Sequence, residues 1–214
     1  MLKKISKQWI LVISLILTLF SQLALSEEKS AENRLFDLLS KLDSMQADFQ
    51  QQVINEQGEL LQETSGGMTI KRPGKLLWIT RIPYQHQVIT DGETLWVYDL
   101  DLEQVTQQAF VRSLDQAPAL LLSGDLTAIS EQFVITNHQD KQNEFRLTPK
   151  NEGSVFAHIE LHFEENQLDR LILNDNFGQR TDIAFNHVLV NLPVQDKQFI
   201  FTPPEHVDLI INEH

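Results

Sequence analysis

The chain has 214 residues, no cysteine, and 17 basic residues against 30 acidic ones, which gives a formal net charge of −13. This acidic balance argues against nucleic acid as a partner and against electrostatic docking on anionic lipid headgroups. The absence of cysteine excludes a scaffold held together by disulfides. Stability must therefore come from the burial of apolar surface.

The first 26 residues have the features of a secretory signal. Lysines in the first seven residues are followed by an apolar run over residues 10–20, ILVISLILTLF. That run is too short to span a bilayer as a permanent helix but suits the core of a signal peptide. Ala24 and Ser26 are small residues at the two positions that a signal peptidase needs. We therefore expect cleavage after Ser26, and without cysteine the segment cannot be a lipoprotein signal.

The remaining chain, residues 27–214, is long enough for a single domain with a sizeable core. Cleavage would remove three lysines and no acidic residue, so the formal net charge would change from −13 to −16.

Residues 30–45 are predicted to form an amphipathic helix. The apolar residues on its one face are Leu35, Leu38, Leu39, Leu42 and Met45. Their spacing of three and four is typical of a helix that packs on a core.

Most of the chain after this helix alternates between apolar and polar residues, which predicts strands. The predicted strands cover residues 47–53, 66–71, 76–79, 88–89, 95–98, 133–136, 145–148, 155–163, 168–173, 181–190 and 199–201. Turns are expected at residues 55–58 and at Asp91-Gly92, a dipeptide typical of tight hairpins. Roughly a dozen strands predict one strongly curved antiparallel sheet with helices against its concave side.

Residues 113–130 interrupt this alternation. Residues 117–124, APALLLSG, are apolar without a period of two. They predict a short helix that ends at Gly124.

The pair His158 and His162, with Glu160 between them, is the sharpest candidate for a metal site. On a helix such a pair could bind zinc. The alternation of residues 155–163 predicts a strand instead, and residues four apart on a strand are about 13 Å apart. We therefore predict no metal site and interpret these side chains as a solvated polar face.

Catalytic patterns are also missing from the sequence. No serine lies in a Gly-x-Ser-x-Gly elbow. Ser65-Gly66-Gly67 leads into a predicted strand and not into a helix N-terminus that could bind phosphate. Glycines at that place favour a bend or a bulge. We predict that the protein is not an enzyme and needs no cofactor.

Four phrases in the sequence, taken in order, resemble the LolA family, the periplasmic carriers of outer-membrane lipoproteins. They are MTIKRPG with Trp78 after it, residues 68–74; ITDGETLWVYD, residues 89–99, which follows Pro83-Tyr84 and precedes Glu103-Gln104-Val105; FRLTPK, residues 145–150; and FIFTPP, residues 199–204. The resemblance covers essentially all of the chain after the signal. One departure is His206, which stands where many members have glycine.

The resemblance implies an unclosed β-barrel of about eleven strands with short helices as a lid over an apolar cavity. The cavity would take the acyl chains of lipoproteins that an inner-membrane ABC transporter releases. A monomeric carrier without stable membrane insertion would then deliver this cargo to the outer-membrane receptor LolB.

The resemblance also implies roles for single residues. Arg72 matches the arginine that bonds to lid carbonyls in the closed, empty state; as a lone arginine it would otherwise be an ordinary surface charge. The candidates for the cavity and its lid are Leu35, Leu38, Leu39, Leu42, Phe49, Leu76, Trp78, Trp96, Pro118, Leu120, Leu121 and Leu122. Phe49, Trp78 and Trp96 could equally be ordinary core residues.

Three other classes of protein fit the sequence less well than a carrier. A receptor of the LolB type needs an N-terminal cysteine for its lipid anchor, and the chain has none. A stress-sensing module that binds an anti-sigma factor uses the same half-barrel but carries a second domain, for which 188 residues leave little room. A lipid hydrolase needs a nucleophile and a base that the sequence does not offer.

Overall fold

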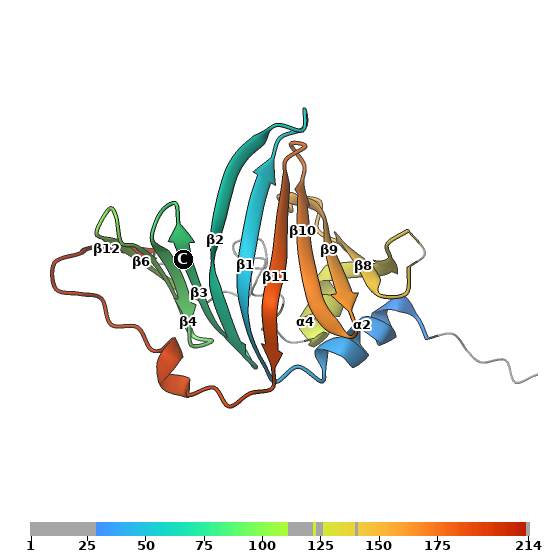
Figure 1. The fold of residues 1–214 in the computed structure, drawn as a ribbon, viewed down its shortest axis with the longest axis horizontal. Coiled ribbons are helices and arrows are strands. Elements are labelled where there is room, and N and C mark those ends of the chain that lie inside the picture. Colours follow the sequence, from blue (N-terminus) through green and yellow to red (C-terminus); the bar gives the residue numbers. More distant parts are fainter. Residues whose placement is uncertain (1–28, 111–121, 123–125, 140, 213–214) are drawn as a thin grey trace, which may run out of the picture.

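The computed structural model describes residues 29–110, 122, 126–139 and 141–212 (Figure 1). The predicted signal segment lies outside these residues, as do Pro118, Leu120 and Leu121 of the predicted second helix. In the described part of the chain, none of the helices has both the length and the apolar character needed to cross a membrane.

The described elements are, in chain order, α2 (Ala31–Leu39), β1 (Ser44–Ile54), β2 (Leu60–Lys71), β3 (Lys75–Ile82), β4 (His86–Thr90), β5 (Thr94–Asp99), β6 (Gln104–Ala109), α4 (Leu126–Gln132), β7 (Phe133–Asn137), β8 (Glu144–Pro149), β9 (Phe156–Glu164), β10 (Gln167–Asp175), β11 (Arg180–Val190), the 3₁₀ helix η1 (Asp196–Phe199) and β12 (Asp208–Asn212).

These strands form one open sheet of twelve strands in the order β12-β6-β5-β4-β3-β2-β1-β11-β10-β9-β8-β7. Strand β1 therefore lies in the middle. On one side of it the chain proceeds outward through β2 to β6, and on the other side it returns from the edge strand β7 inward to β11, which pairs with β1. The sheet is strongly curved, and the helices α2 and α4 lie on its concave side (Figure 1). The predicted fold class is confirmed. The pairing is antiparallel except at one edge, where β12 runs parallel to β6.

The N-terminal helix is shorter than predicted. Its first turn is capped by the Ser30 side chain, which accepts a hydrogen bond from the Asn33 amide. The helix ends at Leu39, and the chain enters β1 at Ser44 instead of continuing to Met45. Met45 pairs with Ile70 and Val190 in the sheet and reaches the same core from a strand. Its position at helical spacing was therefore a coincidence, and the predicted helical placement of Leu42 and Met45 was wrong.

The predicted turns are confirmed. Gly58 adopts a positive φ in the turn between β1 and β2, and Gly92 does so between β4 and β5. The Asp91 side chain accepts hydrogen bonds from the amides of Glu93 and Thr94, which is the local chemistry that makes Asp-Gly a turn signal.

The predicted bend at the paired glycines is also present. The register between β2 and β3 shifts between Ser65 and Gly66. A side chain at Gly66 would place its Cβ 1.8 Å from the carbonyl oxygen of Ile79, so only glycine fits there.

The C-terminal part differs most from the prediction. Residues 199–201 were predicted as a strand, but Phe199 ends the helix η1 and the next residues have no regular structure. Strands β6 and β12 were not predicted, because QVTQQA and DLIIN lack a clear apolar alternation. His206 lies in the turn that leads into β12. Residues 191–207, which connect β11 to β12, are called the C-terminal arm below.

The second helix in the described part is α4, which starts two residues after Gly124 and was not predicted. Of the predicted helix over residues 117–124, the structure describes only Leu122, which is helical and fully buried.

Candidate functional site

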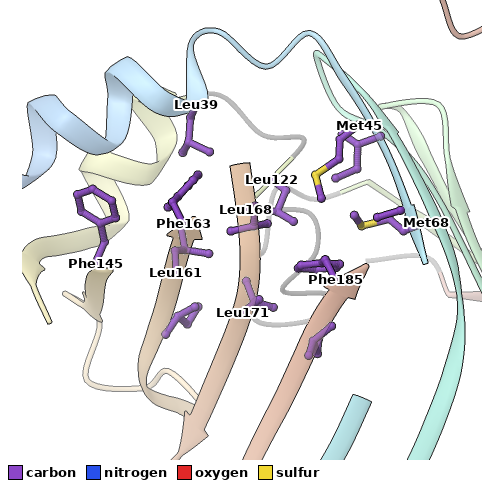
Figure 2. Packing of buried hydrophobic residues seen from close by; sticks show 14 of the residues in the cluster. Leu39, Met45, Met68, Leu122, Phe145, Leu161, Phe163, Leu168, Leu171 and Phe185 are labelled. Atoms are coloured by element: carbon purple, nitrogen blue, oxygen red, sulfur yellow. The ribbon is translucent and has the colours of Figure 1, made fainter. Parts of the chain in front are cut away.

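The concave face of the sheet carries one continuous apolar cluster that includes side chains of the helices. Leu35 and Leu39 of α2, Ile129 of α4 and Leu122 all belong to it, and each is at most 1 % exposed. Figure 2 shows Leu122 among side chains that come from several strands. The helices therefore fill the concavity of the sheet with their own apolar residues.

The side chains that surround Leu122 include two methionines, Met45 from β1 and Met68 from β2 (Figure 2). In the same view Leu168 from β10 lies on the other side of Leu122, and Phe185 from β11 lies below it. Methionine is flexible and polarisable, so it adapts to partners of different shape. The sequence placed Met45 on a predicted helix and Met68 in a family phrase, but none of these four residues was predicted to line the cavity. Their alternation along the strands could have placed them on this face.

Phe49 and Trp78 meet on the same concave face. Their rings stack with centroids 4.0 Å apart and an angle of 27° between the planes. Leu76 lies two residues before Trp78 on β3 and is fully buried. The lack of a side chain at Gly66 leaves room for Phe49, because a Cβ there would lie 2.8 Å from the phenyl ring. Sequence and structure thus bring Phe49, Leu76 and Trp78 together.

Trp96 does not join this group. In the register of β3, β4 and β5, Trp78 lies opposite Val88 and Val88 opposite Val97, whereas Trp96 lies opposite Ile89. Since side chains alternate along a strand, Trp96 is on the convex face. There its ring lies 5.5 Å from the ring of Phe201 in the C-terminal arm.

Arg72 occupies the turn between β2 and β3 and reaches the helical segment. Its Nε donates a hydrogen bond of 3.0 Å to the carbonyl oxygen of Leu122, and this bond is partly buried. The backbone amide of Arg72 donates to the carbonyl of Asp43, just before β1. A guanidinium group suits such a position because it presents several donors in a rigid plane.

Helix α2 is held at the side of the concavity where β7 lies. Arg34 donates to the side chain of Asn137 at the end of β7, over 2.5 Å, and to the carbonyl of Lys29. Leu38 is partly buried against the cluster, and so is Leu42 in the turn after the helix. Helix α2 also contacts β7 and α4.

The convex face contains a polar cluster around Glu160 of β9. Glu160 is only 6 % exposed, so the expectation of a solvated polar face was wrong. Arg146 donates to its carboxylate at 2.9 Å and to Nδ1 of His138 at 2.8 Å. His158 and His162 approach the same carboxylate at 3.1 and 3.5 Å. Residue Ile172 lies across from Glu160 on β10 and is itself buried.

The pKa values in this cluster follow from its burial and its charges. Burial lowers the pKa of His158, and the nearby Arg146 charge acts in the same direction. For Glu160, burial alone would raise the pKa, but the hydrogen bond from Arg146 and the neighbouring positive groups outweigh it and lower the pKa. Within the described residues, no group of three or more histidine and carboxylate side chains is arranged to hold a metal ion.

The geometry defines a class of protein: an open, curved half-barrel whose apolar face is covered by short helical segments. The model of the family described as outer membrane lipoprotein carrier protein LolA matches residues 40–202 of this chain. The chain belongs to the LolA family.

Curated relatives cover nearly the same length. An outer-membrane lipoprotein carrier protein of Chromohalobacter salexigens is 38% identical over 204 residues, which cover 95% of this chain and 96% of the relative. A protein of the same description from Pseudomonas aeruginosa is 40% identical over 196 residues, 91% of this chain and 94% of its own length.

Among solved structures, a LolA superfamily protein from Nitrosomonas europaea superimposes with a TM-score of 0.52 at 12% identity. The match covers 81% of this chain and 98% of that one. It supports the fold.

Proposed function

We propose that this protein carries lipoproteins across the periplasm and shields their acyl chains on the concave apolar face. The observation that carries the proposal is that helical side chains, Leu122 above all, fill this face in a way that acyl chains could replace. The names of the relatives, outer-membrane lipoprotein carrier proteins, support the same cargo. The protein would act by binding and release, without catalysing a reaction.

A carrier of this kind is needed because acyl chains do not cross water unaided. Each methylene group transferred from water to an apolar environment gains about 0.8 kcal/mol. Three long acyl chains would therefore oppose entry into the aqueous phase by roughly tens of kcal/mol on the same scale. A protein that covers the chains removes most of this cost.

The carrier must also release what it binds, and the hydrogen bond from Arg72 to the carbonyl of Leu122, called the latch below, offers a way. In the closed, empty protein, Arg72 bonds to the carbonyl of Leu122 and the helices fill the concavity. Cargo can enter only when Leu122 leaves, which breaks that bond. The stability of the closed state therefore lowers the affinity for cargo and favours release.

The remaining residues and partners fit this scheme. Phe49, Leu76 and Trp78 would line the cavity when the helices move away, and Leu35, Leu38 and Leu39 would line its rim. The protein would be exported by residues 1–26 and act as a monomeric domain over residues 27–214. It would accept cargo from an inner-membrane ABC transporter and deliver it to LolB.

The test is to isolate the protein from the periplasm, extract bound molecules and identify them by mass spectrometry. We expect acylated lipoproteins bound one to one. Non-acylated precursors should not bind under the same conditions. Equal recovery of acylated and non-acylated forms would refute a site for acyl chains.

A second measurement maps the site. A photo-crosslinking residue at Leu76 should label the acyl chains of bound cargo, whereas one at Glu165, on the exposed turn between β9 and β10, should not. Equal labelling at both positions would contradict the concave face as the cargo site.

A further inference from the structure

The hairpin that carries Arg72 is held from outside by the start of the C-terminal arm. Lys71 and Lys75 flank the turn and lie directly across from each other in the register of β2 and β3. Their neighbours Ile70 and Leu76 point into the concave cluster, so both lysines point to the convex side. Two like charges directly opposite each other on one face repel.

Asp196, in the first turn of η1, relieves this repulsion. One of its oxygens lies 2.7 Å from Nζ of Lys71 and 2.9 Å from Nζ of Lys75. Lys71 also donates to the carbonyl of Val194. The two hydrogen bonds from lysine lower the pKa of Asp196 to about 2, so the carboxylate is ionised at neutral pH.

Asn191 holds the segment at the start of β1, and the Arg72 hairpin bonds to that segment. Its side-chain oxygen accepts hydrogen bonds from the amides of Asp43 and Ser44. Its side-chain nitrogen donates to the carbonyl of Lys41. The backbone carbonyl of Asp43 in turn accepts a hydrogen bond from the backbone amide of Arg72. Asn191 has a φ of 58°, a conformation that asparagine tolerates better than most residues.

We propose that Asn191 and Asp196 are positioning residues for Arg72, so that the C-terminal arm on the convex face sets the strength of the latch on the concave face. This proposal rests on the proposed function, because the position of Arg72 matters for release only if its bond to Leu122 acts as a latch. The arm contacts both residues that bracket the Arg72 turn and also the segment to which the Arg72 amide bonds. A shift of the hairpin would therefore move the guanidinium group away from the Leu122 carbonyl.

The sharpest variant is Asp196→Asn, which keeps the shape of the side chain and removes its charge at an exposed position. The control is Asp182→Asn, at a carboxylate that is more buried than Asp196, with 12% of its side chain exposed against 60%. Asp182 also bridges two cations on one face, Arg170 at 3.2 Å and Arg180 at 2.8 Å, but it lies on β11, away from the hairpin.

The first readout does not depend on cargo. In protein labelled with ¹⁵N-arginine, NMR measures how fast the Nε–H of Arg72 exchanges with water. We expect Asp196→Asn to speed this exchange roughly two- to fivefold at low salt, the range for losing a surface ion pair. The difference from the natural protein should shrink near 1 M salt, where the Debye length falls to about 3 Å. Asp182→Asn should leave the exchange unchanged.

The second readout is the release of a fluorescent triacylated lipopeptide from the loaded protein to an excess of purified LolB. Asp196→Asn should slow release by a similar factor, and it should add nothing when Arg72 is already leucine. Unchanged Nε–H exchange in Asp196→Asn, or slowing that persists in the Arg72→Leu background, would overturn the positioning role. Normal release by Arg72→Leu alone would instead refute the latch, whatever Asp196 does.

Discussion

Leu122 offers the most direct test of the idea that one residue competes with cargo. Its side chain is fully buried in the closed protein, among Met45, Met68 and Phe185. The substitution Leu122→Ala removes three carbon atoms, which corresponds to about 2.4 kcal/mol at about 0.8 kcal/mol for each buried group. The cavity that remains adds to this loss where the neighbours do not close it.

In the proposed mechanism the loss falls only on the closed state, because Leu122 leaves its position when cargo enters. A cost of about 2.4 kcal/mol shifts the closed-to-open ratio by a factor of roughly 50. Apparent affinity rises as the open fraction rises, so Leu122→Ala should bind a triacylated lipopeptide up to several tens of times more tightly. Release to LolB should slow accordingly.

The assay is a fluorescence titration with the labelled lipopeptide, together with urea unfolding of the empty protein. Ile172→Ala is the matched control, because it removes the same number of carbons from a buried residue on the convex face. It should lower the unfolding free energy by a similar amount and leave affinity unchanged. Weaker binding by Leu122→Ala, or equal effects of the two variants on affinity, would refute the reasoning.

Three further predictions follow from single contacts. Arg72→Leu should slow or abolish release of cargo in the transfer assay while uptake stays intact, because leucine cannot bond to the carbonyl of Leu122; a normal rate of transfer would count against the latch. Gly66→Ala should lower the free energy of unfolding by about 3 kcal/mol or more, because the new Cβ would meet the carbonyl oxygen of Ile79. Urea unfolding measures this loss, and a value below about 1 kcal/mol would show that β2 and β3 can separate there at little cost. The free energy of unfolding should also decline in acid, because His158 and Glu160 both have a lowered pKa in the folded protein. Such a group contributes stability above its pKa in the unfolded chain, and this stability is lost as the pH falls toward its pKa in the folded protein. The loss from His158 begins below its ordinary pKa of 6.5, and the loss from Glu160 begins below its ordinary pKa of 4.5. Urea unfolding between pH 7.5 and 4 measures this decline, and His158→Gln should flatten its upper part; an unchanged slope in that variant would mean that His158 takes no part.

The fold was largely predictable because one face of the sheet is apolar and the other is mostly polar. Alternation along β9 and β11 assigns one face to the core, and turn residues such as Asp91-Gly92 set where the chain reverses. The helix end was misjudged because Met45 satisfies a helical spacing and a strand pairing at once. Strand β12 was not predicted because all five of its residues are exposed, so its sequence shows no alternation between buried and exposed positions.

The candidate site was predictable only in part. The resemblance to the family pointed to Arg72, whose guanidinium group bonds to the carbonyl of Leu122, and the role of this contact as a latch stays a prediction. A pattern of two along β5 could not say which face of the sheet Trp96 would take, because that depends on the register with β4. The burial of Glu160 was not predictable either, since Ile172 and His138 reach it from other strands and loops.

The proposed double use of one apolar face would let the carrier release its cargo without an energy source of its own. The side chains of Met45, Met68 and Phe185 form a core with Leu122 when the protein is empty, and the same side chains would meet acyl chains when it is loaded. Packing quality and cargo affinity therefore oppose each other: a substitution that improves the contact between Leu122 and the sheet should weaken cargo binding. Two methionines at this contact fit that requirement, because a flexible side chain packs tolerably against both partners and optimally against neither. It follows that replacing Met68 by leucine, which fixes the shape of the face, should change the two states unequally and so change the rate of release more than the stability of the fold.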